Sequence, residues 1–529
     1  MISIQDIHLS ALTKNKTYWN TERPIEEELM YFLLVDRFHD GKLRSTIFSD
    51  KGFGDTETLQ ARCGGTIRGI IAHLTYIAEM GFTSIWINPF LQNNAESYHG
   101  YSIENFLEVD AQWGTKEDIV ELVSKAHDLN MRVFFDVVVN HTGNNWSYVK
   151  ENPCYKNGIR FAAKAWKYDD RPIPSELRNF NCYSRKGRIV DWEEIPETWD
   201  GDIFELKDLI QDDSTIGDQN LEVMIAIYSY WFSLTDCDGF RIDAAKHIAP
   251  AWLNKFISEI KRFAKSVNKK DFFVFAEIIG EESLVNQYTS IDGYLDFDFY
   301  FSFVKSMLGD KKKHNFSTEN KKTPIRFLDN HDQIGQMPKH RIAYRMNESA
   351  FINVLRAFLL LPGIPCVYYG TEQGLKGRGV LDGAIRECLF NPVGEEDMLN
   401  KDSPYWKTIR EFSKIRQKLG ISTAKFANCQ VISSTPSKCI ALQISGLSSD
   451  KMILYNLGAH TEQVSIKLSM PISRTNKLVV YLYSDNGVIE NEVAIINNII
   501  QQIEVKPYGF ILFDILSNEA ISNLREYKI

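Results

Sequence analysis

Residues 239–247 place side chains of the kinds used in catalysis at the end of an apolar run. Arg241 and Asp243 are two residues apart, so in a strand both side chains leave the same face. An arginine beside a carboxylate keeps that carboxylate ionised, which is the state that a carboxylate nucleophile needs. An Arg-x-Asp pair alone is more often a structural ion pair, so this segment by itself does not assign a function.

Three other short acidic segments also follow apolar runs. They are residues 136–141, 275–277 and 327–332, and they contribute Asp136, Glu277 and Asp332 among others. The chain therefore places acids repeatedly at the ends of predicted strands, which makes a site with several carboxylates more probable than a lone ion pair.

Short apolar runs alternate with segments of helical period along most of the chain. The predicted strands are residues 30–35, 84–88, 132–139, 238–243, 272–276, 293–297, 324–328 and 366–369. The predicted helices are residues 69–80, 115–129, 221–234, 252–266, 349–361 and 406–419. Repeated strand–helix units around one core predict an α/β fold, a (β/α)8 TIM barrel, whose chemistry lies at the C-terminal ends of the strands.

Two stretches depart from this alternation. Residues 140–217 are rich in Asn, Asp, Pro, Gly and aromatic residues and are too long for an ordinary connection, which predicts an inserted domain after strand three. After about residue 427 the pattern becomes period-two, which predicts an antiparallel β-sandwich. The expected division is a barrel of residues 1–139 and 218–425, an inserted domain of 140–217 and a C-terminal domain of 426–529.

Charge and hydropathy exclude several classes of protein. A net charge of −9 over 529 residues argues against nucleic-acid and anionic-membrane partners, because those need a basic face. No apolar run of about 18 residues suggests a membrane span. Residues 1–20 lack the apolar core of a signal peptide, so we expect cytoplasmic residence, unless a leader has been removed.

The eight cysteines are scattered, without Cys-x-x-Cys or zinc-type spacing. Cys237 and Cys366 lie beside predicted core strands, so we expect buried free thiols rather than a disulfide framework.

Taken together and in order, the four acidic segments resemble the four conserved segments of the α-amylase family, glycoside hydrolase family 13. The likeness extends over about residues 30–419 and includes residues 65–67, 97–101 and 362–365. The family has a barrel, an inserted domain after strand three and a C-terminal β domain, which agrees with the layout predicted above.

The resemblance implies roles for three carboxylates. Asp243 matches the catalytic nucleophile, Glu277 the general acid/base, and Asp332 the carboxylate that grips sugar hydroxyls next to the cleaved bond. The local sequence before Glu277 is the most apolar, so we expect Glu277 to hold a proton near neutrality, whereas Arg241, oriented by Asp136, should keep Asp243 charged.

The resemblance also implies a set of sugar-binding residues. Tyr101 matches a ring that stacks on the sugar, and the other matching residues contact its hydroxyls or the leaving-group side: His99, His141, Arg241, Lys246, His247 and His331. For His141 a structural role in bridging loops is the alternative. Lys246 and His247 favour α-1,4-glucans over the substrates of the family's α-1,6-oligosaccharidases.

The expected function is thus a retaining hydrolase of α-1,4 bonds in starch, glycogen or maltooligosaccharides. A glucanotransferase or sugar isomerase of the same family is the alternative, and a carbohydrate-binding relative without catalysis is disfavoured by the intact Asp243, Glu277 and Asp332. Endo or exo action, chain-length preference, oligomeric state and glycan binding by the C-terminal domain are left open by the sequence.

No organic cofactor is expected, but the resemblance implies a calcium site. Asn140, Asp208 and the backbone carbonyl of His247 match family ligands, and hard oxygen donors suit calcium. The family segment usually reads Leu-Pro-Asp where this chain has Leu206-Lys207-Asp208, and a nearby lysine charge can weaken or replace the metal. Both a bound calcium ion and a metal-free site therefore stay open.

Overall fold

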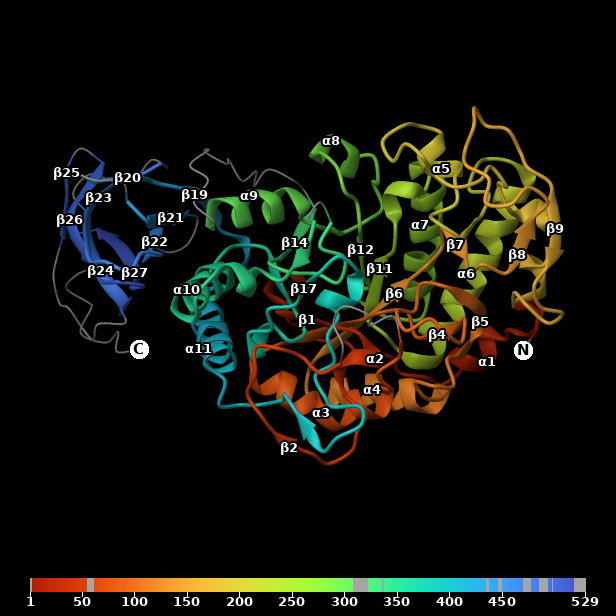
Figure 1. Cartoon of the computed structure of the whole chain (residues 1–529), viewed down its shortest axis with the longest axis horizontal. Coiled ribbons are helices and arrows are strands. Elements are labelled where there is room, and N and C mark those ends of the chain that lie inside the picture. Colours follow the sequence, from red (N-terminus) through yellow and green to blue (C-terminus); the bar gives the residue numbers. More distant parts are fainter. Residues whose placement is uncertain are drawn as a thin grey trace.

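The computed structural model describes residues 2–54, 61–307, 322–334, 337–433, 437–445, 450–469, 477–484, 493–496 and 498–517. Its centre is a closed barrel of parallel strands (Figure 1), in the order β1-β16-β14-β13-β12-β11-β6-β3. The barrel strands are β1 (Met30–Leu33), β3 (Ser84–Ile87), β6 (Arg132–Val137), β11 (Gly239–Ile242), β12 (Phe273–Ala276), β13 (Gly293–Leu295), β14 (Thr323–Phe327) and β16 (Ile364–Tyr368).

The outer helices cover the barrel with apolar stripes. They are α3 (Ile67–Glu79), α4 (Lys116–Asp128), α6 (Thr215–Thr235), α7 (Pro250–Ser266), α9 (Phe297–Met307), α10 (Glu348–Leu359) and α11 (Pro404–Leu419). The predicted start of the helix at residue 115 is confirmed, because Thr115 and Asp118 form a reciprocal capping box. Strands such as β6 and β11 are buried along their whole length, as strands covered on both faces must be.

The predicted barrel is confirmed, with one difference at the sixth strand. The sequence predicts a strand over residues 293–297, but β13 ends at Leu295 and α9 begins at Phe297. The cause is local: the Asp296 carboxylate accepts a hydrogen bond from the Phe299 backbone N–H at 2.9 Å and so caps the new helix.

The residues between β6 and α6 form the insertion, which lies toward one end of the long axis in Figure 1. Its elements are β7 (His141–Thr142), β8 (Trp146–Tyr148), β9 (Ala163–Trp166), α5 (Glu197–Asp200) and β10 (Lys207–Asp208). β7 pairs with β10 and β8 with β9, both antiparallel. Short elements on the barrel side are α1 (Leu9–Thr13), α2 (Val35–Phe38), α8 (Glu282–Val285), β2 (Ser45–Thr46), β4 (Leu91–Asn93), β5 (Ile103–Val109), β15 (Lys339–His340), β17 (Arg378–Gly379) and β18 (Glu396–Asp397).

The C-terminal domain is antiparallel. Its described strands are β19 (Lys425–Asn428), β20 (Gln430–Ile432), β21 (Cys439–Ser445), β22 (Asp450–Asn456), β23 (Glu462–Lys467), β24 (Lys477–Ser484), β25 (Val493–Ile496), β26 (Ile499–Val505) and β27 (Phe510–Ser517). Residues of β21, β22 and β27 share one apolar core with residues of β23 and β26, so two sheet faces pack as a sandwich. This confirms the predicted β-sandwich; residues 518–529 lie outside the described part of the chain.

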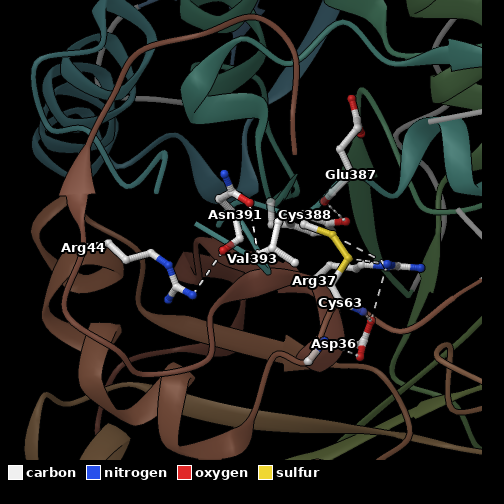
Figure 2. The surroundings of a disulfide bond; sticks show 10 residues. Asp36, Arg37, Arg44, Cys63, Glu387, Cys388, Asn391 and Val393 are labelled. Atoms are coloured by element: carbon white, nitrogen blue, oxygen red, sulfur yellow. Dashed lines mark hydrogen bonds and ion pairs between the residues drawn. A yellow bond between two sulfur atoms is a disulfide. The ribbon is translucent and has the colours of Figure 1, made fainter. Parts of the chain in front are cut away.

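The cysteine prediction is wrong for two residues. Cys63 and Cys388 form a disulfide, with Cα atoms 6.4 Å apart across 325 residues of sequence (Figure 2). Closure of the barrel explains the pairing, because β1 and β16 are neighbours and the loops that follow them meet. The prediction of buried free thiols is confirmed for Cys237 and Cys366.

Across the described ranges, no helix combines the length and the apolar character needed to cross a lipid bilayer.

Candidate active site

Arg241 lies at the centre of the predicted site and contacts three carboxylates. It stands on β11 directly beside Asp136 of β6, and its Nη1 donates to both Asp136 oxygens at 2.8 and 2.9 Å. The same Nη1 donates to Asp243 Oδ1 at 2.7 Å, and Nη2 forms an ion pair with Glu277 Oε2 at 2.6 Å. One buried guanidinium therefore gathers acids from three neighbouring strands.

Asp243 and Glu277 reach this guanidinium because each directly follows a barrel strand. Asp243 comes after β11 and Glu277 after β12, and these strands are paired in register. The Ala244 backbone N–H also donates to Glu277 Oε2 at 3.1 Å. Both side chains keep 11% of their surface exposed, so a ligand can reach them although they are deeply set.

Asp332, the third predicted acid, belongs to the same cluster. The His331 ring, next to it in the chain, lies parallel to the Tyr101 ring with centroids 5.4 Å apart, and the Tyr101 hydroxyl donates to Asp136. Arg386 Nη2 donates to its Oδ1 at 2.7 Å, and His331 Nε2 lies 3.3 Å from its Oδ2. Its side chain is 28% exposed, more than the other two, so it faces the open side of the site.

Burial sets the protonation of these carboxyls. Burial raises the pKa of Asp243 and of Glu277 to about 7, and the two share the charge of Arg241. Burial also opposes ionisation of Asp332, but His331 and Arg386 lower its pKa to about 2. The sequence predicts a charged Asp243 and a protonated Glu277. The pKa values of the two groups do not differ in this way, because Arg241 contacts both of them.

The predicted aromatic and histidine residues surround Asp136 and Asp332. The Tyr101 hydroxyl donates to Asp136 Oδ2 at 2.9 Å, and its ring lies parallel to the rings of His331 and His99, with centroids 5.4 and 5.7 Å away. His141 Nε2 lies 3.1 Å from the Tyr101 carbonyl oxygen, which is a loop-bridging contact. Four of the predicted residues thus form one connected layer.

Lys246 and His247 lie on the short turn Ala245–His247 after β11. Lys246 Nζ forms an ion pair with Glu193 Oε1 at 2.6 Å, and His247 Nδ1 lies 3.0 Å from the Thr198 carbonyl oxygen. Both contacts join the catalytic barrel to the insertion.

The proposed calcium ligands contain unsatisfied oxygen atoms. Asn140 Oδ1 and both carboxylate oxygens of Asp208 are buried without a hydrogen-bond partner among the described residues. Such buried, unpaired hard oxygens fit a calcium ion. No group of three or more His, Cys, Asp or Glu side chains in the described residues forms a metal cluster, so carbonyl oxygens or water would have to complete the coordination.

Lys207 does not occupy this position. Its ammonium lies 3.6 Å from Asp202 Oδ2 and above the rings of Trp146 and Tyr148, at 5.1 and 5.0 Å from their centroids. Adjacent residues of a strand point to opposite faces, which takes the Lys207 charge away from the Asp208 carboxylate. The departure from the family's Leu-Pro-Asp segment therefore leaves the oxygen donors free for a cation.

Sequence reasoning missed Arg386 and Trp86. Arg386 holds Asp332 and also donates from Nε to the His331 carbonyl oxygen at 2.7 Å. Trp86 Nε1 donates to Asp136 Oδ2 at 3.2 Å. The ending of β3 shortly after Trp86 was a usable signal, whereas Arg386 follows a short 3-10 helix (Asp382–Ile385) and not an apolar barrel strand that would mark its position.

Comparison with known proteins places this arrangement in a family. The family model for the alpha amylase catalytic domain matches residues 32–419. A cyclomaltodextrin glucanotransferase of Klebsiella oxytoca is 27% identical over 451 residues, which cover 74% of this chain and 64% of the relative. An alpha-amylase of Streptomyces lividans is 28% identical over 401 residues, which cover 65% of this chain and 42% of the relative. The matched part of the chain thus covers less than two thirds of the length of each of these two relatives.

Among solved structures, an Anoxybacillus alpha-amylase superposes with a TM-score of 0.70 at 24% identity, covering 94% of this chain and 99% of that one. This likeness establishes the shared fold. Because the family model covers most of the chain, the protein belongs to the alpha-amylase family.

Proposed function

We propose that the protein is a retaining glycosidase that cleaves α-1,4-glucosidic bonds in starch, glycogen or maltooligosaccharides. The observation that carries the proposal is the bridging of Asp243 and Glu277 by one guanidinium, Arg241. Two carboxyls that share a guanidinium lie close together, and retaining glycosidases use pairs about 5 Å apart, whereas inverting enzymes need room for a water molecule between them.

In the first step, Glu277 acts as the acid and Asp243 as the nucleophile. Protonated Glu277 gives its proton to the glycosidic oxygen while the Asp243 carboxylate attacks the anomeric carbon. The bond from that carbon to the leaving oxygen breaks, and an ester between the sugar and Asp243 forms. Arg241 is already paired with Asp243 and Glu277, and burial raises the pKa of each acid to about 7, so both protonation states of each acid are accessible near neutral pH.

In the second step, the Glu277 carboxylate takes a proton from water while the water oxygen attacks the anomeric carbon and the Asp243 ester bond breaks. Asp332, held ionised by His331 and Arg386, grips hydroxyls of the sugar in both steps. A calcium ion held by Asn140, Asp208 and the His247 carbonyl would fix the insertion against the barrel. It takes no part in proton transfer or bond breaking.

A glucanotransferase uses the same ester intermediate but passes the sugar to another sugar hydroxyl. The match to a relative named cyclomaltodextrin glucanotransferase keeps this alternative open. Digestion of maltoheptaose with linkage analysis separates the two: a hydrolase yields only shorter chains, and a transferase yields longer, cyclic or newly linked products. An isomerase would change the linkage without changing chain length.

The roles of the two acids are tested with two substrates. Asp243→Asn and Glu277→Gln should each slow starch hydrolysis by roughly a thousandfold or more. With α-maltosyl fluoride, whose leaving group needs no proton, Glu277→Gln should recover much of the ester-forming step, while Asp243→Asn should not. Near-normal starch hydrolysis by either variant, with folding intact, would refute the assignment.

We also propose the domain division at residues 140–217 and 426–529, on the layout of the strands described above. Limited proteolysis that first cuts near these boundaries supports it.

A further inference from the structure

The insertion contains a groove whose lining carries more basic than acidic side chains. The groove has a volume of about 580 Å³. Its basic residues are Lys150, Lys164, Lys167, Arg188 and Lys207, and three acidic residues share the lining with them. The excess is local, because the whole chain has 60 Lys and Arg residues against 69 Asp and Glu residues.

Two of the three lining carboxylates are already paired with lining cations. Glu205 forms an ion pair with Arg188 at 2.8 Å. Asp202 lies 3.6 Å from the Lys207 ammonium and also accepts a hydrogen bond from the Tyr148 hydroxyl at 2.7 Å. The negative charges of Glu205 and Asp202 are therefore balanced by their own partners and do not balance the other lysines.

The other three lysines share the groove with one acid. Lys150, Lys164 and Lys167 are exposed residues and form no ion pair within the part of the chain that the structure describes. The remaining lining acid, Glu151, is also exposed and cannot neutralise three ammonium groups. A concave surface with an excess of one sign of charge concentrates ions of the opposite sign. The groove therefore favours an anionic ligand.

The three lysines come from one hairpin whose backbone is held in place. Lys150 follows β8, Lys164 lies in β9 and Lys167 follows β9, and the two strands pair antiparallel. The Lys167 backbone N–H donates to the Asn145 carbonyl oxygen at 2.8 Å, which closes this end of the pair. β8 and β9 lie at the end of the molecule opposite the C-terminal domain (Figure 1). The groove is thus built on ordered strands and shares no lining residue with the catalytic cluster.

The charge and the size of the groove suit a phosphate ester. A phosphate monoester carries nearly two negative charges at pH 7 and three strong acceptor oxygens, whereas a single carboxylate would leave more of the lysine charge unbalanced. Lysine ammonium groups bind phosphate oxygens as point charges. The volume lies within the range of sites for small organic molecules, so the groove has room for the organic part of an ester as well.

We propose that this groove binds a phosphate monoester through Lys150, Lys164 and Lys167. The phosphoryl group belongs either to a small free molecule or to a phosphorylated unit of a glucan, and the chemistry of recognition is the same in both. The proposal does not rest on the proposed function, because binding in the groove uses neither Asp243 nor Glu277.

Calorimetric titration of the full-length protein with glucose 6-phosphate tests the site. A double variant with Lys164→Gln and Lys167→Gln should bind this ester about five- to tenfold more weakly. Added salt should also weaken binding to the parent protein, because the lysines are exposed. A second double variant, Lys156→Gln with Lys265→Gln, removes two exposed lysines outside the groove. This matched control should change the affinity by less than about twofold, and circular dichroism checks the folding of both variants.

Two further measurements identify the carrier of the phosphoryl group. Glucose should not displace glucose 6-phosphate, and inorganic phosphate should bind more weakly than the ester. If a glucan carries the group, the parent should degrade phosphorylated amylopectin faster than phosphatase-treated amylopectin, and the double variant at Lys164 and Lys167 should lose this difference. Displacement of the ester by glucose, or unchanged affinity in that folded double variant, together with equal rates on the two amylopectins, would overturn the proposal. Inorganic phosphate binding as tightly as the ester would refute a site for esters.

Discussion

Arg386 donates to Asp332 at 2.7 Å from Nη2 and to the carbonyl oxygen of His331, the residue before it, at 2.7 Å from Nε. A third contact runs from Nη1 to the Tyr98 hydroxyl at 3.2 Å. One guanidinium thus fixes both the side chain and the backbone of the segment that carries the third acid. Because it makes three contacts, Arg386 fixes the orientation of Asp332, which a single charged atom would not do.

Arg386→Ala should lower kcat/KM on maltoheptaose by about a hundredfold, because a misplaced carboxylate loses its grip on the sugar. Loss of the guanidinium charge also raises the pKa of Asp332 from about 2, which titration of the Asp332 carboxyl followed by NMR should detect. Arg386→Lys should recover only part of the activity, since lysine cannot make the three contacts. Arg378→Ala, which removes an exposed arginine bonded to Tyr344, serves as control. Near-normal kcat/KM in Arg386→Ala, with an unchanged pKa of Asp332, would contradict the positioning role.

The raised pKa values of Asp243 and Glu277 predict a bell-shaped dependence of kcat/KM on pH. Burial raises the pKa of Asp243 and Glu277 to about 7, so their protonated forms are favoured relative to free carboxylic acids. As the pH rises through about 7, Glu277 loses the proton it must donate; as the pH falls, Asp243 gains one and stops being a nucleophile.

Steady-state rates across pH check the bell shape, and α-maltosyl fluoride assigns its limbs. With this substrate, Glu277→Gln should lose the alkaline limb and keep the acid limb, because only Asp243 then titrates. Persistence of the alkaline limb in that variant would mean that the limb does not report the titration of Glu277.

Much of this site was predictable because each acid directly follows an apolar run. Asp136, Asp243 and Glu277 come from paired neighbouring strands, so their convergence follows from the parallel barrel. The roles of Tyr101 and the histidines came only from the family resemblance. The prediction that Glu277 holds the proton was based on local hydrophobicity. It could not include a guanidinium that touches both acids.

The features that escaped sequence reasoning depend on contacts between loops distant in sequence or on a local cap. Cys63 and Cys388 approach only because the first and last strands pair, and no spacing rule connects residues 325 apart. Arg386 reaches Asp332 because the loops that carry them follow β16 and β14, which are paired neighbours. No helix was predicted where α9 lies, because Asp296 acts as a cap immediately after a strand, where the apolar run continues unchanged.

Removal of divalent cations should destabilise the protein if calcium fills the site at Asn140 and Asp208. A ligand at a hundredfold excess over its dissociation constant stabilises the native state by about 2.7 kcal/mol. The midpoint of thermal unfolding should therefore fall with EDTA and recover with Ca²⁺. Asp208→Asn should lower the midpoint and abolish the response, whereas Asp213→Asn, at a carboxylate 78% exposed, should preserve it. If EDTA leaves the unfolding midpoint of the parent protein unchanged, the proposal of a stabilising calcium ion at this site is wrong.

The disulfide joins the loops after the first and last barrel strands, and Arg37 links it to the site. Arg37 lies 3.9 Å above the ring of Tyr98, whose hydroxyl contacts Arg386, and its Nη1 faces the two sulfur atoms. Figure 2 shows Arg37 between the disulfide and Asp36. The bridge is therefore connected through three side chains to the acid that grips the sugar.

Cys388→Ser should lower the free energy of unfolding by about 2–5 kcal/mol, because the link closes a long loop in the unfolded chain. Thiol titration of the denatured protein should find six free cysteines before reduction and eight after it. Cys154→Ser, at an exposed free cysteine, is the control and should leave the unfolding midpoint unchanged. Disulfides are typical of oxidising compartments, so eight free thiols in protein purified without reductant would favour the cytoplasmic residence expected from the sequence and contradict the bridge.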